Sequence, residues 1–241
     1  MRSALFAAEN LEKESAQPGM RLQNSKMLKI ELNGECLART GSMVAYQGHV
    51  QFQALGSGGV GKWLKQKLTG EGVPLMKLTG RGDVFLAERA ADIHLVDLEP
   101  GDALSINGAN VLAFDATLQY DVKMVQGMGM ASSAGLFNCV FTGQGRIAVT
   151  TKGTPVVLNV DQPTYVDPQA AICWSANLQT GYHRADQLGI GTLLGRTTGE
   201  AFTMSFAGQG FVVVQPSEEP PSGLAGAAQQ QQGGLLGGLI K

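Results

Sequence analysis

The chain contains no hydrophobic run long enough to cross a membrane as a helix. Such a helix needs about 18 or more consecutive apolar residues, and the 241-residue sequence has no such stretch. The opening residues Met1–Phe6 form too short an apolar run before Glu9 to act as a secretory signal. We therefore expect a soluble protein of the cytoplasm.

Net charge and metal-binding residue types are also scarce. Lysine and arginine number 18 against 20 aspartates and glutamates, so the net charge of −2 provides no basic field to attract nucleic acid or anionic lipid. The few cysteines and histidines lack the spacing of a metal site, which predicts no metal and no cofactor. The odd number of cysteines, lying in apolar stretches, indicates reduced, buried thiols rather than disulfides. These residues are Cys36, Cys139, Cys173, His49, His94 and His183.

Glycine, in contrast, is abundant at 33 residues, and six glycines form three Gly-x-Gly elements of one design. Each element joins two apolar runs, where a glycine pair marks a bend or bulge that a side chain would obstruct. The first glycines, at positions 80, 143 and 208, are 63 and 65 residues apart. This constant period predicts a threefold internal repeat, each copy being two strands joined by a kink. The pairs are Gly80 and Gly82, Gly143 and Gly145, and Gly208 and Gly210.

A second motif places one aromatic residue ahead of each glycine pair: Tyr46, Phe114 and Trp174. Because strand side chains alternate between faces, the apolar residues of this motif can share a face only if a bulge interrupts the strand. We expect the three aromatic side chains to fill equivalent core positions. A binding role for them is the alternative interpretation.

These patterns predict an all-β fold in which three pseudo-repeats form a sandwich. Each repeat holds four or five short strands, with turn signals about every 8–12 residues, which is the spacing expected of a sandwich or barrel. The first strand is expected at Lys29–Leu32, with Asn33–Gly34 as its hairpin turn. Residues 1–217 would form one domain, whereas residues 218–241 are a low-complexity tail of glycine, glutamine and leucine that cannot build a core.

Each repeat also carries a glycine-rich connector between the aromatic motif and the glycine pair. In the first connector, Trp63 and its apolar neighbours at helical spacing predict a short amphipathic helix. The preceding Gly56–Lys62 fits seven positions of a phosphate-binding loop, but Trp63 stands where a metal-binding hydroxyl is needed. We therefore expect no nucleotide hydrolysis.

Catalytic chemistry is not indicated elsewhere. No histidine accompanies a serine or cysteine in a strained turn, and a lone histidine on a strand is usually structural. The tripeptide Arg81–Asp83 belongs to the repeat and carries no adhesion signal here. Asp115 is the charged residue at a repeat position where Gln47 and Ser175 stand in the other copies, a weak sign of one asymmetric site. We expect no catalytic residues and no enzyme.

The sequence resembles the family named for altered inheritance of mitochondria, a bacterial and mitochondrial group of β proteins, and is similar to its bacterial members. The resemblance covers residues 1–215 and implies a shortened double-stranded β-helix, the fold of the ring-forming tryptophan RNA-binding attenuation protein. Bacterial members have no established activity, mitochondrial relatives are linked to inner-membrane organisation, and no catalytic residues can be carried over. The resemblance rests on Gly41–Tyr46, Gly70–Glu71, Gly80-x-Gly82, the Leu98, Gly101 and Asp102 pattern, and Val111–Asp115.

The leading interpretation is a non-enzymatic β scaffold or binding protein that forms homo-oligomers. One alternative is a nucleic-acid-binding ring protein, which the acidic balance disfavours. Another is a peripheral membrane-associated organising protein. We expect the tail to capture a neighbouring subunit or a protein partner, so that its deletion would leave the fold intact but weaken assembly. The candidate interaction residues are Trp63, Leu235, Leu236, Leu239 and Ile240.

Overall fold

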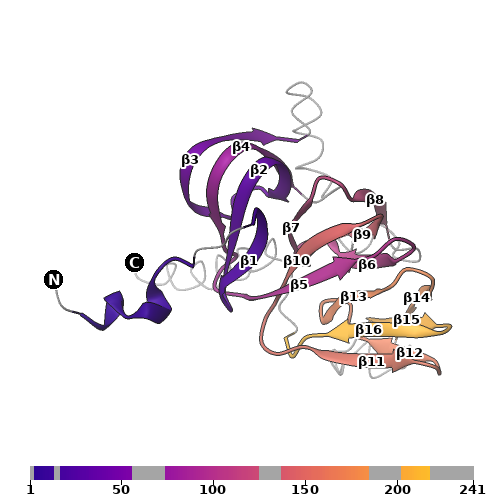
Figure 1. Ribbon diagram of the computed structural model, residues 1–241. Helices are drawn as coiled ribbons and strands as arrows, with labels where there is room; N and C mark the ends of the chain where they lie inside the picture. The colour runs from indigo at the N-terminus through magenta and orange to yellow at the C-terminus, as the bar shows by residue number, and fades with distance from the viewer. Residues whose placement is uncertain (1–2, 14–16, 56–73, 125–136, 185–201, 218–241) are drawn as a thin grey trace, which may run out of the picture.

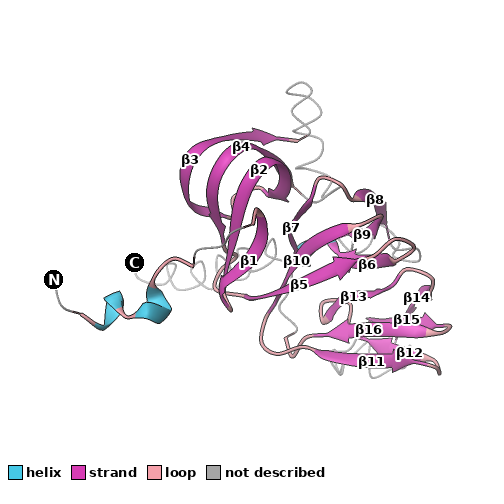
Figure 2. Ribbon diagram, viewed as in Figure 1, coloured by secondary structure: helices cyan, strands magenta, loops and turns pink. Residues whose placement is uncertain are grey.

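In the computed structural model, strands make up most of the described chain (Figures 1 and 2). The structure describes residues 3–13, 17–55, 74–124, 137–184 and 202–217. Within these residues the helical elements are short 3-10 turns at Ala4–Phe6, Ala8–Asn10 and Gly108–Asn110. The strands are β1 Gly19–Asn24, β2 Met27–Arg39, β3 Met43–Ala54, β4 Leu75–Leu86, β5 Asp92–Leu98, β6 Ala103–Asn107, β7 Val111–Asp115, β8 Gln119–Met124, β9 Phe137–Thr142, β10 Gly145–Thr151, β11 Val156–Val160, β12 Thr164–Val166, β13 Ala171–Ser175, β14 Gln179–Arg184, β15 Phe202–Ala207 and β16 Gly210–Val214.

The strands form three sheets in which every described pairing is antiparallel. The seven-stranded sheet follows the order β3-β4-β2-β7-β10-β5, with β1 beside β2. The six-stranded sheet follows β11-β16-β13-β6-β9-β8, and the three-stranded sheet follows β12-β15-β14. The prediction of an all-β, sandwich-like fold is confirmed.

The chain runs through these sheets in three successive units: the first unit is β1–β4, the second β5–β10 and the third β11–β16 (Figure 1). In the second and third units, two separate strands meet at each glycine pair, as the motif predicts. In the first unit a single bent strand, β4, runs through Gly80 and Gly82 with φ of +119° and +154°. The same kinked ribbon is therefore continuous in one unit and interrupted in the other two.

The strand register gives the aromatic residues one equivalent position in each unit. Each aromatic pairs with the residue that lies two positions after the second glycine of its unit. The ladder also shifts register two residues before each aromatic, at Val44, Leu112 and Ile172, so a bulge interrupts each strand there. The aromatic pairs are Tyr46–Val84, Phe114–Ile147 and Trp174–Val212.

The expected hairpin turn at Asn33–Gly34 is wrong. The strand β2 continues through Gly34, which has φ of +124°, and pairs with β4 on both sides of that glycine. The hairpin instead joins β1 to β2 through Ser25 and Lys26. An Asn-Gly pair favours a turn locally, but β4 offers a continuous partner, and the ladder keeps the strand extended.

A close approach of β3 to β4 explains why Gly80 must be glycine. A Cβ atom built at Gly80 would overlap the backbone carbonyl oxygen of His49. Gly34 has a similar positive φ, yet nothing lies within 4 Å of a Cβ built there. Conformation alone therefore requires glycine at Gly34, whereas conformation and packing both require it at Gly80.

Each unit packs part of its core into the unit before it. The bulge residue Leu112 of the second unit belongs to the buried cluster formed around Ile30, Ala38 and Leu86 of the first unit. In the same way, Ile172 of the third unit belongs to the buried cluster of the second unit. Two ladders accompany this packing, β2 with β7 and β6 with β13. The core is therefore continuous from unit to unit.

Candidate interaction surface and buried lysine cluster

The strand β3 occupies the edge of the seven-stranded sheet and pairs in the described structure with β4 alone. Its equivalents in the other units are interior strands. The strand β7 lies between β10 and β2, and β13 lies between β16 and β6. Among the described strands, the second unit thus covers the first unit on the side of β2, and none pairs with β3 on its outer side.

The edge position corrects the expectation that all three aromatics are core residues. Phe114 and Trp174 are 0% and 4% exposed, whereas Tyr46 is 50% exposed. Tyr46 still packs its ring edge-to-face on Phe52 with centroids 5.2 Å apart, as Phe114 does on Tyr120 at 5.0 Å. The local pairing is kept, but no described strand of a neighbouring unit covers Tyr46.

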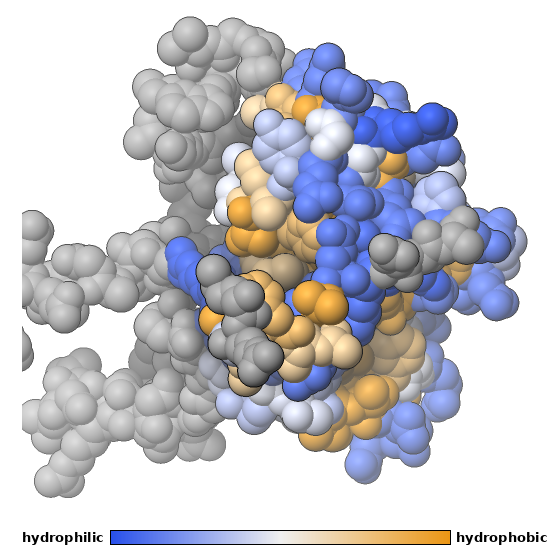
Figure 3. Space-filling view, turned by 60° about the vertical axis from the view of Figure 1, so that its left-hand side comes forward, coloured by the Kyte–Doolittle hydropathy of each residue, from blue (hydrophilic) through white to orange (hydrophobic). Residues whose placement is uncertain are grey.

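The bulge residues show the same contrast. Leu112 and Ile172 are fully buried, while Val44 is 54% exposed, and Met43 beside it is also exposed. Figure 3 shows hydrophobic side chains reaching the surface at several places on one face of the molecule. An edge strand that carries exposed apolar residues is an unusual feature that commonly marks a contact surface.

A second apolar surface lies on the third unit. The strand β11 is an edge strand that exposes Val156, Val157 and Leu158. Beside it is an open groove of about 530 Å³, and Leu158 and Tyr165 lie at this groove. The rest of its lining consists of apolar and polar residues: Val166, Ala170, Val214 and Pro216, and Asp167, Gln215 and Ser217.

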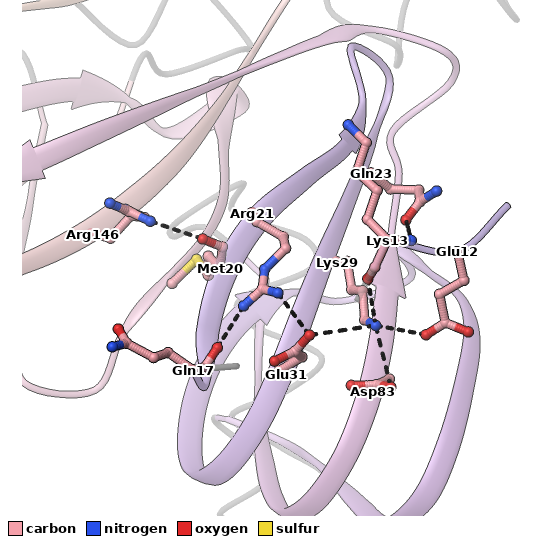
Figure 4. Close-up of polar contacts among 10 residues, drawn as sticks. All are labelled: Glu12, Lys13, Gln17, Met20, Arg21, Gln23, Lys29, Glu31, Asp83 and Arg146. Carbon is pink, nitrogen blue, oxygen red and sulfur yellow. Dashed lines mark hydrogen bonds and ion pairs between the residues drawn. The ribbon is translucent and has the colours of Figure 1, made fainter. Parts of the chain in front are cut away.

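A polar cluster surrounds the buried side chain of Lys29 (Figure 4). Its ammonium group lies 2.6 Å from Glu12, 3.4 Å from Asp83 and 3.5 Å from Glu31. It also donates a hydrogen bond of 2.9 Å to the carbonyl oxygen of Lys13. The cluster therefore fastens the N-terminal segment to the β2–β4 ladder.

The charge state of Lys29 follows from competing effects. Burial disfavours the ammonium ion most strongly, but the hydrogen bond that the ammonium group donates to Glu12 and the charges of Asp83 and Glu12 outweigh burial and raise the pKa of Lys29 above its usual value. A lysine that stays protonated has no free electron pair with which to attack a carbonyl group. The cluster is suited to holding segments together, not to nucleophilic chemistry.

Two arginines extend this network. Arg21 forms an ion pair with Glu31 at 2.7 Å and donates to the carbonyl oxygen of Gln17, while Arg146 donates to the carbonyl oxygen of Met20 (Figure 4). A shallow groove of about 400 Å³ lies beside the cluster. The groove is lined by Gln17, Pro18, Glu31, Leu32, Asn33, Arg81, Gly82 and Asp83.

The three thiols are poor nucleophiles. Burial raises the pKa of Cys36 to about 12, of Cys139 to about 11 and of Cys173 to about 12. The thiolate is the reactive form, so these groups stay protonated at neutral pH. Within the described part of the chain, no three histidine, cysteine, aspartate or glutamate side chains gather as metal ligands would.

The weak sign of an asymmetric site at Asp115 has a structural explanation. Its carboxylate accepts a hydrogen bond of 2.8 Å from the backbone N–H of Arg146, and the hydroxyl of Ser175 accepts one of 3.0 Å from Phe211. Both donors follow the second glycine of their units. The repeat position thus caps the strand after the kink in the second and third units.

Several residues singled out in the sequence lie outside the described residues: Trp63 with the phosphate-loop-like segment, and Leu235, Leu236, Leu239 and Ile240 of the tail. The sequence patterns did not mark Lys29 or Val44 as site residues. A lysine within an apolar strand pattern, as at Lys29, is a sequence signal for a buried charge. The exposure of Val44 has no such signal, because it depends on which strands lie beside β3.

A family model described as mitochondrial biogenesis AIM24 matches residues 20–217 of the chain. The chain belongs to this family. The resemblance inferred from the repeat motifs is therefore confirmed. The AIM24 model begins within β1 and ends after β16, so it spans all three units.

The fold of this AIM24 member also occurs in a solved structure. The crystal structure of a protein from Streptococcus pyogenes superposes with a TM-score of 0.65, covering 89% of this chain and 99% of that chain at 18% sequence identity. At this identity the likeness shows the fold alone. No curated protein matches the sequence. Among the described residues, no helix has the length and apolar character needed to cross a membrane.

Proposed function

We propose that this AIM24 protein is a non-enzymatic β scaffold that self-assembles through the apolar surfaces on its first and third units. One observation carries the proposal: Val44 and Tyr46 are about half exposed on β3, although their equivalents in the other two units are buried. Burying an apolar side chain contributes on the order of 1.5–3 kcal/mol. Covering this edge would therefore be favourable and would also satisfy its unpaired backbone groups.

The chemistry of the described side chains supports a structural role. The three thiols are buried and protonated, and Lys29 is held as an ammonium ion among carboxylates. Reduced thiols also fit the cytoplasm, where we place the protein. Within the part of the chain that the structure describes, several basic side chains form ion pairs inside the molecule, which favours a protein surface over nucleic acid as the partner. Those in ion pairs include Arg21, Lys26, Lys29, Lys77 and Arg146.

Sedimentation of the full-length protein over a wide concentration range tests the proposal. We expect mass above the 25.3 kDa of one chain, increasing with concentration. Replacing Tyr46 by Ser should shift the distribution toward one chain, whereas replacing the similarly exposed Tyr120 should not. A wild-type protein that stays at the mass of one chain at every concentration would contradict self-assembly.

Peripheral membrane contact is a second candidate, favoured by the exposed N-terminal side chains of Leu5, Phe6 and Leu11. Apolar side chains of this kind can enter the interface of a bilayer. Co-sedimentation with vesicles of mixed zwitterionic and anionic lipids tests it. Binding should fall when Leu5 and Phe6 are both replaced by Ser, and equal binding of the variant would argue against contact through this segment.

A further inference from the structure

We infer that residues 234–240, called here the C-terminal segment, add a strand to the outer edge of β11 in their own molecule. The segment lies outside the described residues, and the position it would take is defined by described ones. The inference goes beyond the proposed self-assembly, because it concerns a contact within one chain.

The first unit shows how such an edge is covered. Residues 28–31 of β2 pair with β4 on one side and with β1 on the other. Between these two strands, the side chains of Leu28, Lys29 and Ile30 are at most 2% exposed. The strand β1 also adds Met20 to the buried cluster of the first unit. An added strand therefore buries this stretch completely.

The same stretch of the third unit is uncovered. Leu158 is equivalent to Ile30, because each pairs with the residue two positions after the second glycine of its unit. Residues 156–159 of β11 are therefore the counterpart of residues 28–31. No described strand pairs with the outer edge of β11, which is the lowermost strand in Figure 1. The three apolar side chains of this stretch are 37–62% exposed.

The edge of β11 also differs in charge from its counterpart in the second unit. The corresponding stretch of β5 includes Asp97, which forms an ion pair with Arg146 at 2.6 Å. Charged side chains on an edge strand discourage pairing with a further strand. The strand β11 reads Val-Val-Leu-Asn-Val and carries no charged side chain. Its edge is therefore suited to a strand that is neutral and apolar.

The chain leaves the third unit beside this edge. Val214 pairs with Val156, so β16 ends where β11 begins. The side chain of Gln215 is buried and accepts a 2.9 Å hydrogen bond from the backbone N–H of Lys152. Ser217, the last described residue, lines the groove beside β11. The residues that follow Ser217 therefore start next to the uncovered edge.

The C-terminal segment can reach this edge from its own chain. The sixteen residues 218–233 can extend to about 50 Å, whereas β11 is about 17 Å long. A segment tethered within reach of its site has an effective local concentration in the millimolar range. A segment from another molecule at micromolar concentration competes poorly with it. The favoured occupant is therefore the segment of the same chain.

The chemistry of the segment also matches the edge. Residues 234–240 carry no charge, and as a strand they would place Leu235 and Leu239 on one face and Leu236 and Ile240 on the other. The strand β11 likewise exposes apolar side chains on both faces, because neighbouring residues along a strand point in opposite directions. A segment that is apolar on both faces would bury both sides of this edge.

Amide hydrogen exchange of the full-length protein tests the inference. A strand on the outer edge of β11 protects the backbone N–H groups that point away from β16. We expect β11 to exchange at least about fivefold faster when the four apolar residues of the C-terminal segment are replaced by Ser. The matched control replaces the four glutamines at 229–232 by Ser and should leave this exchange unchanged. Equal exchange of β11 in all three proteins would overturn the inference and leave the proposed self-assembly intact.

Crosslinking with a short bis-maleimide distinguishes the segment of the same chain from that of a second copy. One protein carries both Val157→Cys and Leu236→Cys, and two further proteins carry one change each. We expect the double variant to be joined within single chains, and the mixed single variants to give at least about tenfold less crosslinked product. The natural thiols are buried and should not compete. A dominant crosslinked dimer from the mixture would place the segment on a second copy and overturn the inference.

A change on the edge itself gives an independent test. Val157→Asp places a charge on the edge of β11 and should release the segment. We expect chymotrypsin to cleave the segment at its leucines at least about fivefold faster in this variant. Val122→Asp, on the exposed edge strand β8, is the control and should leave cleavage unchanged. Unchanged melting of both variants shows that the fold is kept, and cleavage of Val157→Asp at the wild-type rate would overturn the inference.

Discussion

At the scale of single residues, the ammonium group of Lys29 joins segments that are distant in the sequence. It contacts Glu12 of the N-terminal segment, Glu31 of its own strand and Asp83 of β4. Removing one member of such a buried group leaves the other charges uncompensated, which is costly even where the intact group contributes little net stability.

We predict that Lys29→Met lowers the free energy of unfolding by about 3 kcal/mol, measured by urea denaturation. Lys26→Met is the control, because its exposed ion pair with Asp92 should change stability by at most about 0.5 kcal/mol. Since the pKa of Lys29 is raised in the folded protein, its contribution is complete at pH 7 and is lost as the pH rises through the folded pKa. Equal stability of the two variants would contradict this role.

The glycines allow a second prediction at this scale. Gly34→Ala and Gly80→Ala place a side chain at nearly the same positive φ, but only the second also meets the carbonyl oxygen of His49. Gly34→Ala should cost about 1–3 kcal/mol from backbone strain. Gly80→Ala should cost at least about 2 kcal/mol more, because β3 must move away from β4. Similar losses in urea denaturation would mean that the close approach does not limit this position.

At the scale of elements, one motif has different consequences in an interior strand and in an edge strand. The aromatic residue and the bulge residue before it occur in β3, β7 and β13 at the same register. In β7 and β13 a strand of the preceding unit covers them, and in β3 none does within the described chain. Burial is therefore decided by the neighbouring element and not by the motif.

Alanine substitution of the three aromatics should reveal this difference. Phe114→Ala and Trp174→Ala should each lower the free energy of unfolding by about 3–5 kcal/mol, since both side chains are buried. Tyr46→Ala should cost no more than about 1 kcal/mol in the dissociated protein, because its side chain is half exposed. Chemical denaturation at low protein concentration measures all three, and equal losses would contradict the edge position of β3.

At the scale of the whole molecule, the charges disfavour recognition of nucleic acid. The net charge is −2, so the molecule has no overall positive charge to attract phosphates. Several described basic side chains are also held in ion pairs, which a phosphate contact would have to break. We predict micromolar or weaker RNA binding in a filter assay at about 150 mM salt. Nanomolar, sequence-dependent affinity under these conditions would favour the nucleic-acid-binding alternative.

The sequence by itself determined the β class and the positions of the glycine pairs between apolar runs. Glycine pairs and alternating apolar residues act locally, because a kink needs a missing side chain and a strand needs a two-residue period. The bulge before Phe114 followed from the same local rule. The family could also be inferred, since its motifs are short runs of neighbouring residues such as Gly41–Tyr46.

Only the tertiary structure decided which repeat is left uncovered. Tyr46 and Trp174 occupy equivalent positions in the sequence, but their exposure depends on whether another strand lies beside them. Gly34 shows the same limit, because β4 turns an expected hairpin into a continuous strand. The partners of Lys29 come from three segments that meet only in the fold. Strand order decides whether a strand lies at the edge or in the interior of a sheet and which charged side chains meet. Local sequence patterns do not encode this order.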